Sequence, residues 1–388
     1  METPAVYRPV LFDLGPLSEA QTDHALEAIY KAQSDLPPEQ ADIWEPHHSP
    51  FVRDLIERFT ARGLSRIASV QQALADWESG AYHVPSKTIP DRPGLHPRWT
   101  EDEIALVRLY LESLPPAQWQ LDDWMLASEL AFQQYLPPDF AWTEADWLTR
   151  RAVLMGRVQA SMAEISDAGA TALLEAEAVP VAAEKALQAA VTYGRARAAE
   201  NIVALSDGLR HRIRRVLIEH AEAKALNVAP ESTLESRLLD DFGLANRDWR
   251  RIALTESCEM QNQGMVAAQE PGQKLRRFEQ YANSCIYCKK VHGQVFTVVP
   301  VDKPYKNPDT EVWPTKTNIG RSQSPRKRVG NILIPRTPDE MWTVPAGVIH
   351  PHCRGQWVQV HQPTSSGDPA FDAWVRDMLA TIPTEPEL

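Results

Sequence analysis

Residues 182–226, which decide the fold class, read AAEKALQAAVTYGRARAAENIVALSDGLRHRIRRVLIEHAEAKAL. The stretch consists almost wholly of good helix formers and contains no proline, so it predicts one long helix. Its apolar residues recur every three or four positions and form one continuous stripe, which must be buried against other elements. The stripe residues are Ile202, Leu205, Leu209, Ile213, Val216 and Leu217.

The polar side of this segment is rich in arginine. A solvated helix face accounts for these cations, and contact with a partner is the alternative interpretation. The arginines are Arg195, Arg197, Arg210, Arg212, Arg214 and Arg215.

Further helical patterns lie on both sides of this segment. Thr100 and Glu103 form a capping box that opens a helix to about residue 114. Proline-rich stretches at 35–50 and 80–98 are expected to be loops. The other predicted helices cover residues 18–32, 51–77, 119–135, 143 to beyond 162, 233–243 and 246–263.

After Gly272 the pattern changes to short apolar runs between turns. These predict short strands near 278–281, 285–288, 295–299 and 344–360, a long loop at 300–345, a linker at 363–370 and a terminal helix at 371–382. The expected fold class is mainly α, with helical N-terminal and central regions and a small α+β C-terminal module. The expected domains are 1–140 (acidic, helical, rich in Trp and Pro), 141–270 (long helices), 271–362 (small module) and 363–388 (linker and helix).

The 388 residues carry a net charge of −12, which is not the composition of a nucleic-acid-binding protein. The charge is uneven: residues 1–150 hold 24 acidic and 11 basic side chains, and the rest hold 28 and 29. The same front part holds seven of the 12 Trp residues. Either these Trp form a core, or some anchor a partner, such as a neighbouring copy of the chain. The chain shows no signal peptide pattern and no apolar run long enough for a transmembrane helix.

The strongest chemical signal is Cys285-Ile-Tyr-Cys288 together with His350-Pro-His-Cys353. Each pair places two ligands three residues apart, as in structural zinc sites, and two such turns complete a tetrahedron. We therefore predict one Zn²⁺ held by Cys285, Cys288, His350 and Cys353. Two free thiols beside a chance HxxC motif are the alternative. His352 and His292 are competing ligands; His352 has poor spacing to Cys353, and His292 is better explained by a backbone hydrogen bond that orders its turn.

An enzyme is the weaker interpretation. A zinc deaminase pattern could use His220-Ala-Glu222 with Cys285 and Cys288, but Ser284 stands where that pattern has proline, and His350 and Cys353 would be unexplained. HExxH, GxSxG, P-loop and GxGxxG motifs are absent. Four protein ligands would close the zinc site, whereas an open position beside an unpaired Glu would favour a zinc-dependent enzyme acting on nucleic acid.

A second basic segment lies in the predicted long loop. A basic loop can contact a phosphate backbone or an acidic protein surface, and both contacts are expectations for this segment. Its cations are Arg321, Arg326, Lys327 and Arg328.

These motifs together resemble the phage Mu F-like head morphogenesis domain, the minor head protein family of tailed bacteriophages. The family pattern is a helical lead-in, an IARTE-type helix, a CxxC followed by a glycine turn, and HPxCRC. The matching segments here are Arg251–Glu256, Cys285–Cys288, Val291–Gly293 and His350–Arg354, over roughly residues 180–360. The sequence departs from the pattern at Leu254, in place of arginine, and at Gly355, in place of the last cysteine.

The resemblance implies a virion component and not an enzyme. Such proteins are internal, low-copy head proteins associated with the portal vertex, made in the host cytoplasm and packaged into the procapsid. The expected partners are the portal protein and other head proteins, with several copies in each virion. Contact with packaged DNA, or help in its packaging or ejection, is a further expectation, and no membrane is expected.

Overall fold

Long helices dominate the computed structural model, which describes residues 50–161, 167–181, 183–226, 234–279 and 284–360. The main helices are α2 (Pro50–Ser79), α3 (Glu101–Ser113), α4 (Leu121–Tyr135), α5 (Phe140–Ala160), α6 (Asp167–Glu175), α7 (Lys185–Ala225), α8 (Leu234–Ala267) and α9 (Ile286–Val291). Two 3₁₀ turns are η1 (Pro116–Gln118) and η2 (Pro338–Glu340). The predictions for 18–32, 363–370, 371–382 and Trp44 lie outside the described residues.

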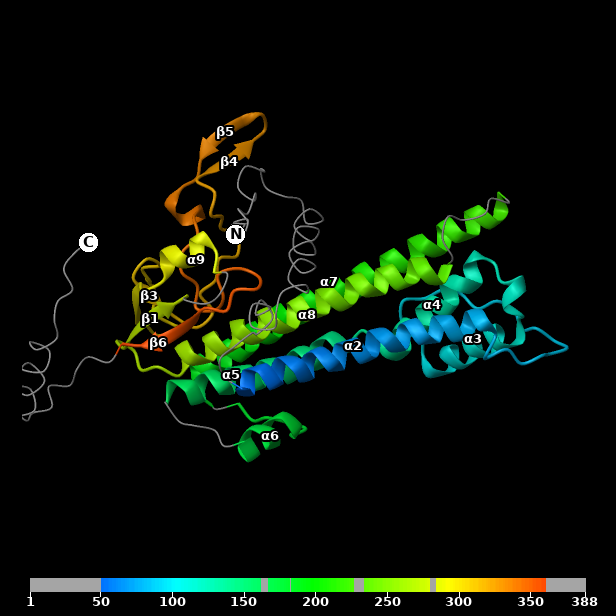
Figure 1. The fold of residues 1–388 in the computed structure, drawn as a ribbon, viewed down its shortest axis with the longest axis horizontal. Coiled ribbons are helices and arrows are strands. Elements are labelled where there is room, and N and C mark those ends of the chain that lie inside the picture. The colour runs from blue at the N-terminus through cyan, green and yellow to red at the C-terminus, as the bar shows by residue number, and fades with distance from the viewer. Residues whose placement is uncertain (1–49, 162–166, 182, 227–233, 280–283, 361–388) are drawn as a thin grey trace, which may run out of the picture. The chain divides into compact units, whose positions relative to one another are not determined.

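Helices α2, α5, α7 and α8 run side by side and form the core (Figure 1). The predicted long helix is confirmed as α7, and all six residues of its apolar stripe are buried. Contacts of α2 with α8 and of α4 with α7 join residues from both sides of position 140. The described residues from position 50 onward belong to one compact unit.

Helices α5 and α8 approach so closely that their backbones touch. A Cβ atom added at Gly156 would lie 2.0 Å from the carbonyl oxygen of Gln261, and one added at Gly264 would lie 2.2 Å from that of Val153. Two glycines therefore permit this crossing, since any side chain would push the helices apart.

The strands form a small C-terminal layer. A four-stranded sheet has the order β3-β2-β1-β6, with β1 (Lys274–Phe278) antiparallel to both β2 (Val295–Val298) and β6 (Gln356–Gln359). Strand β3 (Glu311–Val312) pairs parallel to β2. Strands β4 (Arg326–Val329) and β5 (Ile332–Pro335) form a separate hairpin. The expected class is thus confirmed at this level: a mainly helical chain with a small strand-containing C-terminal region.

Several predicted boundaries were wrong. The two helices expected on either side of Gly243 are one helix, α8, because a solvated glycine weakens a helix by only about 1 kcal/mol and does not end it. Helix α5 begins at Phe140, directly after the Pro137-Pro138 break, and not at Thr143. The strand expected at 278–281 is Lys274–Phe278, and residues 280–283 lie outside the described residues. The strand expected at 285–288 is instead the start of helix α9, because the Cys285 side chain caps this helix by accepting a hydrogen bond from the backbone N–H of Cys288. The long loop at 300–345 contains a hairpin, since four residues on either side of a Gly330-Asn331 turn suffice to pair.

The Trp residues of the front part mostly pack inside the fold. Trp77, Trp99 and Trp119 are buried in one cluster with Val107 and Leu111, and Trp124 packs against it. Trp142 is half exposed. The core interpretation therefore holds for the clustered Trp residues, and the capping box of Thr100 and Glu103 that opens α3 is also confirmed.

The arginines of α7 are neither a free basic surface nor simply solvated. Arg210 and Arg214 both contact the buried carboxylate of Glu129 on α4, at 3.2 and 2.9 Å. Arg212 lies 3.5 Å from Asp241 of α8. These cations tie α7 to its neighbouring helices. None of the described helices is long and apolar enough to cross a membrane.

Candidate metal centre

Cysteines 285 and 288 are brought together by the start of α9. Cys285 is the N-cap residue of this helix, and its Sγ accepts a hydrogen bond from the backbone N–H of Cys288 at 3.4 Å. Residues three apart at a helix start lie on the same side, so both sulfurs point in one direction. Cys288 is fully buried, whereas Cys285 is partly exposed.

The imidazole of His350 meets both sulfurs. Its Nε2 lies 3.2 Å from the Sγ of Cys285 and 3.2 Å from the Sγ of Cys288. In a tetrahedral zinc site the corresponding sulfur–nitrogen separation is about 3.5 Å, as follows from the usual bond lengths. His350 Nδ1 lies 2.7 Å from the carbonyl oxygen of Pro351, which leaves Nε2 free to coordinate. These three side chains form a group that can hold a metal ion.

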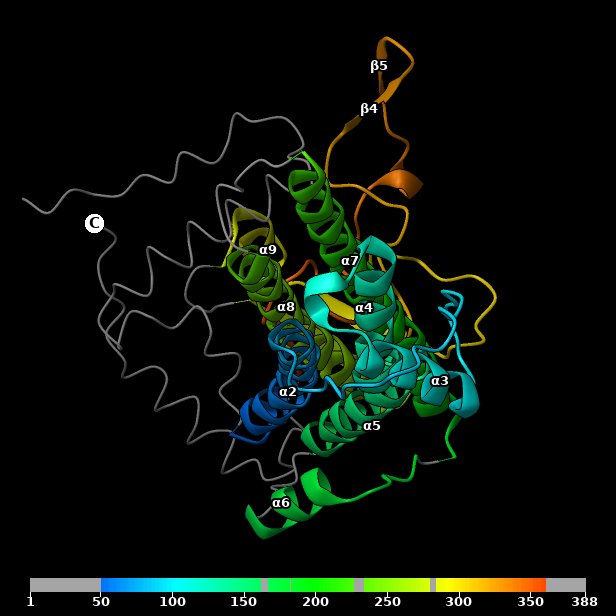
Figure 2. The same cartoon turned by 90° about the vertical axis from the view of Figure 1, so that its right-hand side faces the viewer.

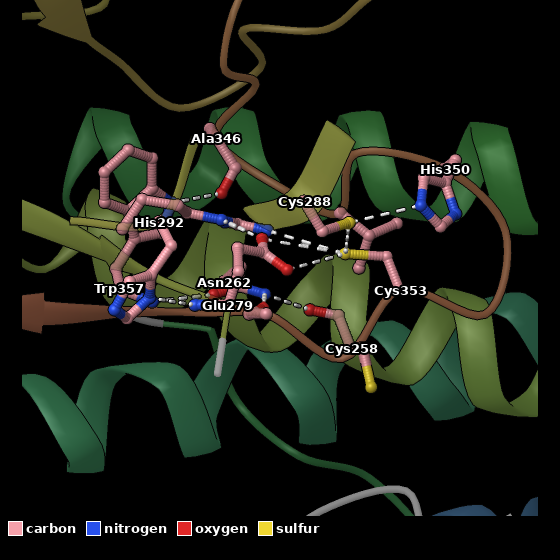
Figure 3. Close-up of polar contacts among 12 residues, drawn as sticks. Cys258, Asn262, Glu279, Cys288, His292, Ala346, His350, Cys353 and Trp357 are labelled. Atoms are coloured by element: carbon pink, nitrogen blue, oxygen red, sulfur yellow. Dashed lines mark hydrogen bonds and ion pairs between the residues drawn. The ribbon is translucent and has the colours of Figure 1, made fainter. Parts of the chain in front are cut away.

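Cys353 joins this group through Cys288. Their sulfurs are 4.0 Å apart, close to the roughly 3.8 Å expected between two thiolates on one zinc ion. Cys353 also belongs to a second possible metal-binding group, with Glu279 and Cys288 (Figure 3). Its Sγ lies 3.4 Å from a carboxylate oxygen of Glu279. The donor set thus fits a zinc ion, with Cys288 shared between the two groups.

The electrostatics of the cluster favour thiolates at Cys285 and Cys353, whereas hydrogen bonding to these two sulfurs, together with burial, raises the pKa of Cys288. Hydrogen bonding from Cys288 lowers the pKa of Cys285 to about 3 against the effect of burial, and His350 adds to this. Burial opposes a low pKa at Cys353, but hydrogen bonding to Cys288 and the charges of Arg277 and His350 bring it well below the usual value. Burial would lower the pKa of His350, yet its contact with Cys285 raises it to about 9. Thiolates and neutral imidazole are the forms that bind zinc, so metal binding would release the imidazole proton.

Arg277 and Glu279, which the sequence patterns did not single out, form a buried ion pair beside the sulfurs. Both are fully buried, and Arg277 Nε donates to Glu279 at 2.6 Å. Arg277 Nη2 also donates to the Cys353 sulfur at 3.9 Å. Burial raises the pKa of Glu279 to about 7, although Arg277 acts in the opposite direction. An arginine at an inward position of a strand was the only sequence signal for this pair.

The carboxylate of Glu279 fills the space next to Gly355. A Cβ atom added at Gly355 would lie 1.9 Å from Glu279 Oε1. Gly355 is the position where the family pattern has its last cysteine. In this chain, therefore, the carboxylate of Glu279 leaves no room for a side chain at position 355.

We expect Gly355→Ala to displace the Glu279 carboxylate and to weaken metal binding by about tenfold or more, since neighbouring groups orient the ligands. Competition with a chelator of known affinity measures the effect. Gly272→Ala, in the turn just before β1, is a poor control, because the φ of 94° at Gly272 disfavours any side chain. Gly94→Ala, where the added methyl group meets no other atom, is the suitable control.

Helix α8 holds the loop that carries His350 and Cys353. Glu259 accepts a hydrogen bond from the backbone N–H of Val348 at 2.6 Å, and Thr255 accepts one from that of His352 at 3.3 Å. Asn262 donates to the carbonyl oxygen of Gly355 at 2.8 Å. These buried polar side chains replace the regular hydrogen bonds that a loop lacks. The sequence motif in this helix was recognised, but the motif does not indicate that the helix holds the loop of His350 and Cys353.

The competing ligands lie elsewhere. His352 has a positive φ of 63°, and burial lowers the pKa of its side chain to about 4; it belongs to neither metal-binding group. His292 Nδ1 accepts a hydrogen bond from the backbone N–H of Glu279 at 3.0 Å, which confirms its predicted ordering role. His220 lies on α7 outside both groups. The buried thiol of Cys258 points away from the cluster (Figure 3), and burial raises its pKa to about 12.

The four basic residues of the second basic segment are placed on and before the hairpin. Arg321 Nη1 donates to the carbonyl oxygen of Met341 at 3.0 Å, and Lys327 pairs with Glu340. Arg326 and Arg328 are exposed on β4. The segment is therefore a strand pair with two of its cations engaged locally.

Comparisons with protein-family models, with curated proteins and with solved structures found no match.

Proposed function

We propose that this chain is a minor head protein of a tailed bacteriophage, located inside the head and associated with the portal vertex. One observation carries the proposal: the segments that bear the family resemblance, far apart in sequence, contact one another. Thr255 of the IALTE segment holds the loop of His350 and Cys353, and that loop meets the Cys285–Cys288 turn. Motif segments that belong to one conserved domain are expected to lie together in the fold. Segments that match the family pattern by chance would not be expected to contact one another.

In this proposal one structural zinc ion is held by Cys285, Cys288, His350 and Cys353. The ion would supply a fourfold cross-link and no reaction. It would close the chain between Cys288 and His350, a segment with short strands and long irregular stretches. The buried Arg277 guanidinium places a positive charge beside the sulfurs and so favours thiolates in this apolar setting.

The enzyme alternative receives no specific support. A hydrolytic zinc site needs a position for water and a carboxylate to accept its proton. Glu279 is the carboxylate beside the sulfurs, and it is buried and paired with Arg277. The arrangement supports a structural ion.

The location of the protein in the particle tests the proposal. The gene should be tagged in the phage or prophage that carries it, and heads purified before and after DNA packaging should be examined by mass spectrometry and by cryo-electron microscopy. We expect the chain in both kinds of head, at low copy number and next to the portal. Its absence from particles that are otherwise complete would refute the proposal.

Contact with DNA is a separable part of the proposal. If Arg326 and Arg328 meet phosphates, replacing both with Ala should reduce the slope of log affinity against log salt concentration by about 2, or roughly one for each lost contact. Fluorescence anisotropy with duplex DNA measures this slope. Arg321→Ala and Lys327→Ala are matched controls, because these side chains are already engaged within the chain. An unchanged slope would show that Arg326 and Arg328 do not contact phosphates and would leave them as solubility residues or portal contacts.

A further inference from the structure

The strand-containing C-terminal region is basic, whereas the rest of the chain is strongly acidic. Residues 271–360 hold 14 basic and six acidic side chains, a net charge of +8. The whole chain carries −12, so the other residues together carry −20. A basic region attracts polyanions even when the chain that contains it is acidic overall. The overall composition therefore conceals a local excess of positive charge.

Four exposed cations of this region have no ion-pair partner in the part of the chain that the structure describes. Lys289 and Lys290 lie in the last turn of α9, and Arg326 and Arg328 lie on β4. All four side chains are exposed. Single surface cations are common, so the relative positions of these four decide whether they form a binding surface.

Helix α9 and the hairpin of β4 and β5 are neighbours. The ring of Tyr287 in α9 lies 5.2 Å from the ring of Trp342, measured between centroids. Trp342 Nε1 in turn donates to the carbonyl oxygen of Arg321, just before the hairpin. In Figure 1, α9 and the hairpin both lie above the sheet. The cations of α9 and of the hairpin thus lie on the same side of the C-terminal region.

A second pair of exposed cations, Lys274 and Arg276 of β1, lies on the other side of the sheet. Arg277, the next residue of this strand, is buried and donates to Cys353, whose sulfur lies 4.0 Å from that of Cys288 in α9. Because neighbouring side chains of a strand point to opposite faces, α9 covers the face that Lys274 and Arg276 do not share. This pair has the same charge as the lysine pair of α9.

The hairpin has the shape of a ribbon that can enter a groove. Its strands form a two-stranded sheet that extends away from the rest of the C-terminal region (Figure 2). The major groove of B-DNA, about 12 Å wide, accommodates a two-stranded β-ribbon. Val329 and Ile332 pair with each other next to the turn and are 55% and 67% exposed. A ribbon that enters tip first places these aliphatic side chains against the base edges and removes them from water.

The arginines lie farther from the tip of the hairpin. Arg326 is about 10 Å from Val329 along the strand, and the major groove is about 8.5 Å deep, so Arg326 reaches the phosphates at its rim. The pairing of the strands puts Arg326 and Arg328 on the face opposite Val329 and Ile332. A flat surface could therefore contact only one of these sets. A groove has a floor and two walls, so it can contact both.

We propose that the C-terminal region binds duplex DNA, with the hairpin tip in the major groove, Arg326 and Arg328 at the phosphates of its rim, and Lys289 and Lys290 at neighbouring phosphates. The inference rests on the proposed function, of which DNA contact is a separable part, and it deepens that contact by naming the surface and the groove. Duplex DNA fits better than an acidic protein surface, because it presents phosphates at constant density on both sides of a groove that a ribbon can enter.

The salt dependence of duplex binding tests the surface. The double variant Lys289→Ala and Lys290→Ala should reduce the slope of log affinity against log salt concentration by about 2, and removal of all four cations should reduce it by about 4. The double variant Lys274→Ala and Arg276→Ala loses the same charge from the other side of the sheet, so its slope should equal that of wild type. Fluorescence anisotropy of the full-length protein with a labelled duplex measures each slope.

The insertion of the tip has its own test. Ile332→Ser removes an aliphatic contact and no phosphate contact, so duplex binding should weaken about tenfold at an unchanged slope. Ile332 is exposed, and the fold should persist. Leu106→Ser is the matched control, because Leu106 is 56% exposed on α3, outside the C-terminal region. Poly-glutamate has negative charge but no groove, so it should displace the duplex only weakly.

Absence of duplex binding by wild type at low salt would overturn the proposal. So would equal losses of slope in the two double variants, because overall charge and not one surface would then govern binding. If only the arginines change the slope, or if Ile332→Ser binds like wild type, a DNA contact of the proposed function stands but the larger surface or the insertion is wrong. If poly-glutamate displaces the duplex readily, the surface fits an acidic protein and the proposal is wrong. The location of the chain in the phage head is measured independently of these results.

Discussion

Cys288→Ser should yield a protein that binds no zinc and whose residues 274–360 are no longer folded. Cys288 is the residue common to both groups that can hold a metal ion, is completely buried, and contacts both His350 and Cys353. Structural zinc sites contribute apparent binding free energies of about 10–16 kcal/mol, which is as large as the whole stability of an ordinary domain, about 5–15 kcal/mol. Loss of this ligand therefore removes more than the small sheet can replace.

The measurements are metal content by mass spectrometry and amide hydrogen exchange. Wild-type protein should contain about one zinc ion per chain, and the variant none. Exchange should become fast in β1, β2 and β6, while α5 and α7 keep their protection because their packing lies within the helical core. Treating wild type with a strong chelator should reproduce the pattern.

Cys258→Ala is the matched control for this experiment. Cys258 is equally buried, but it belongs to neither metal-binding group. We expect this variant to keep its zinc and to lose only the stability of a small buried side chain, about 1 kcal/mol. Full zinc content in Cys288→Ser, or a folded module after chelation, would contradict the assignment.

The sequence predicts the local parts of the site but not the contacts between residues that are far apart in the chain. The CxxC and HxxC turns are local, so their spacing alone predicts which side chains converge. Arg277 and Glu279 reach the sulfurs through the pairing of β1 with β6, which spacing cannot reveal. The same holds for Glu259 and Asn262, because helical periodicity cannot show which polar residues of α8 face the metal-binding loop.

The fold shows the same division. Residues 182–226 predicted their helix because periodicity and composition agreed along the whole segment. The division at Gly243 was wrong because a glycine in a solvated helix position resembles a helix end in sequence, whereas the packing of α8 continues through it. The hairpin was missed because its strands are four residues long and have little periodicity to detect.

Substitutions at the α5–α8 crossing should have the largest effect on the helical core. In Gly156→Ala the new methyl carbon would lie 2.0 Å from one backbone atom and 2.4 Å from another, and in Gly264→Ala the nearest atom is again backbone. Backbone cannot rotate away as a side chain can, so the helices must separate along their interface. We expect each variant to lose about 3 kcal/mol or more, measured by urea unfolding.

Gly243→Ala is the control that separates helix propensity from packing. Gly243 lies within α8 like Gly264, but a methyl group added there meets no other atom. Alanine is favoured over glycine in a helix by about 1 kcal/mol, so this variant should be more stable than wild type. The same change on the same helix should therefore have opposite signs at the two positions. Equal effects of the two substitutions on stability would mean that α8 is interrupted at Gly243 or that its contact with α5 is loose. In either case, the close crossing of α5 and α8 would not be the contact that stabilises the helical core.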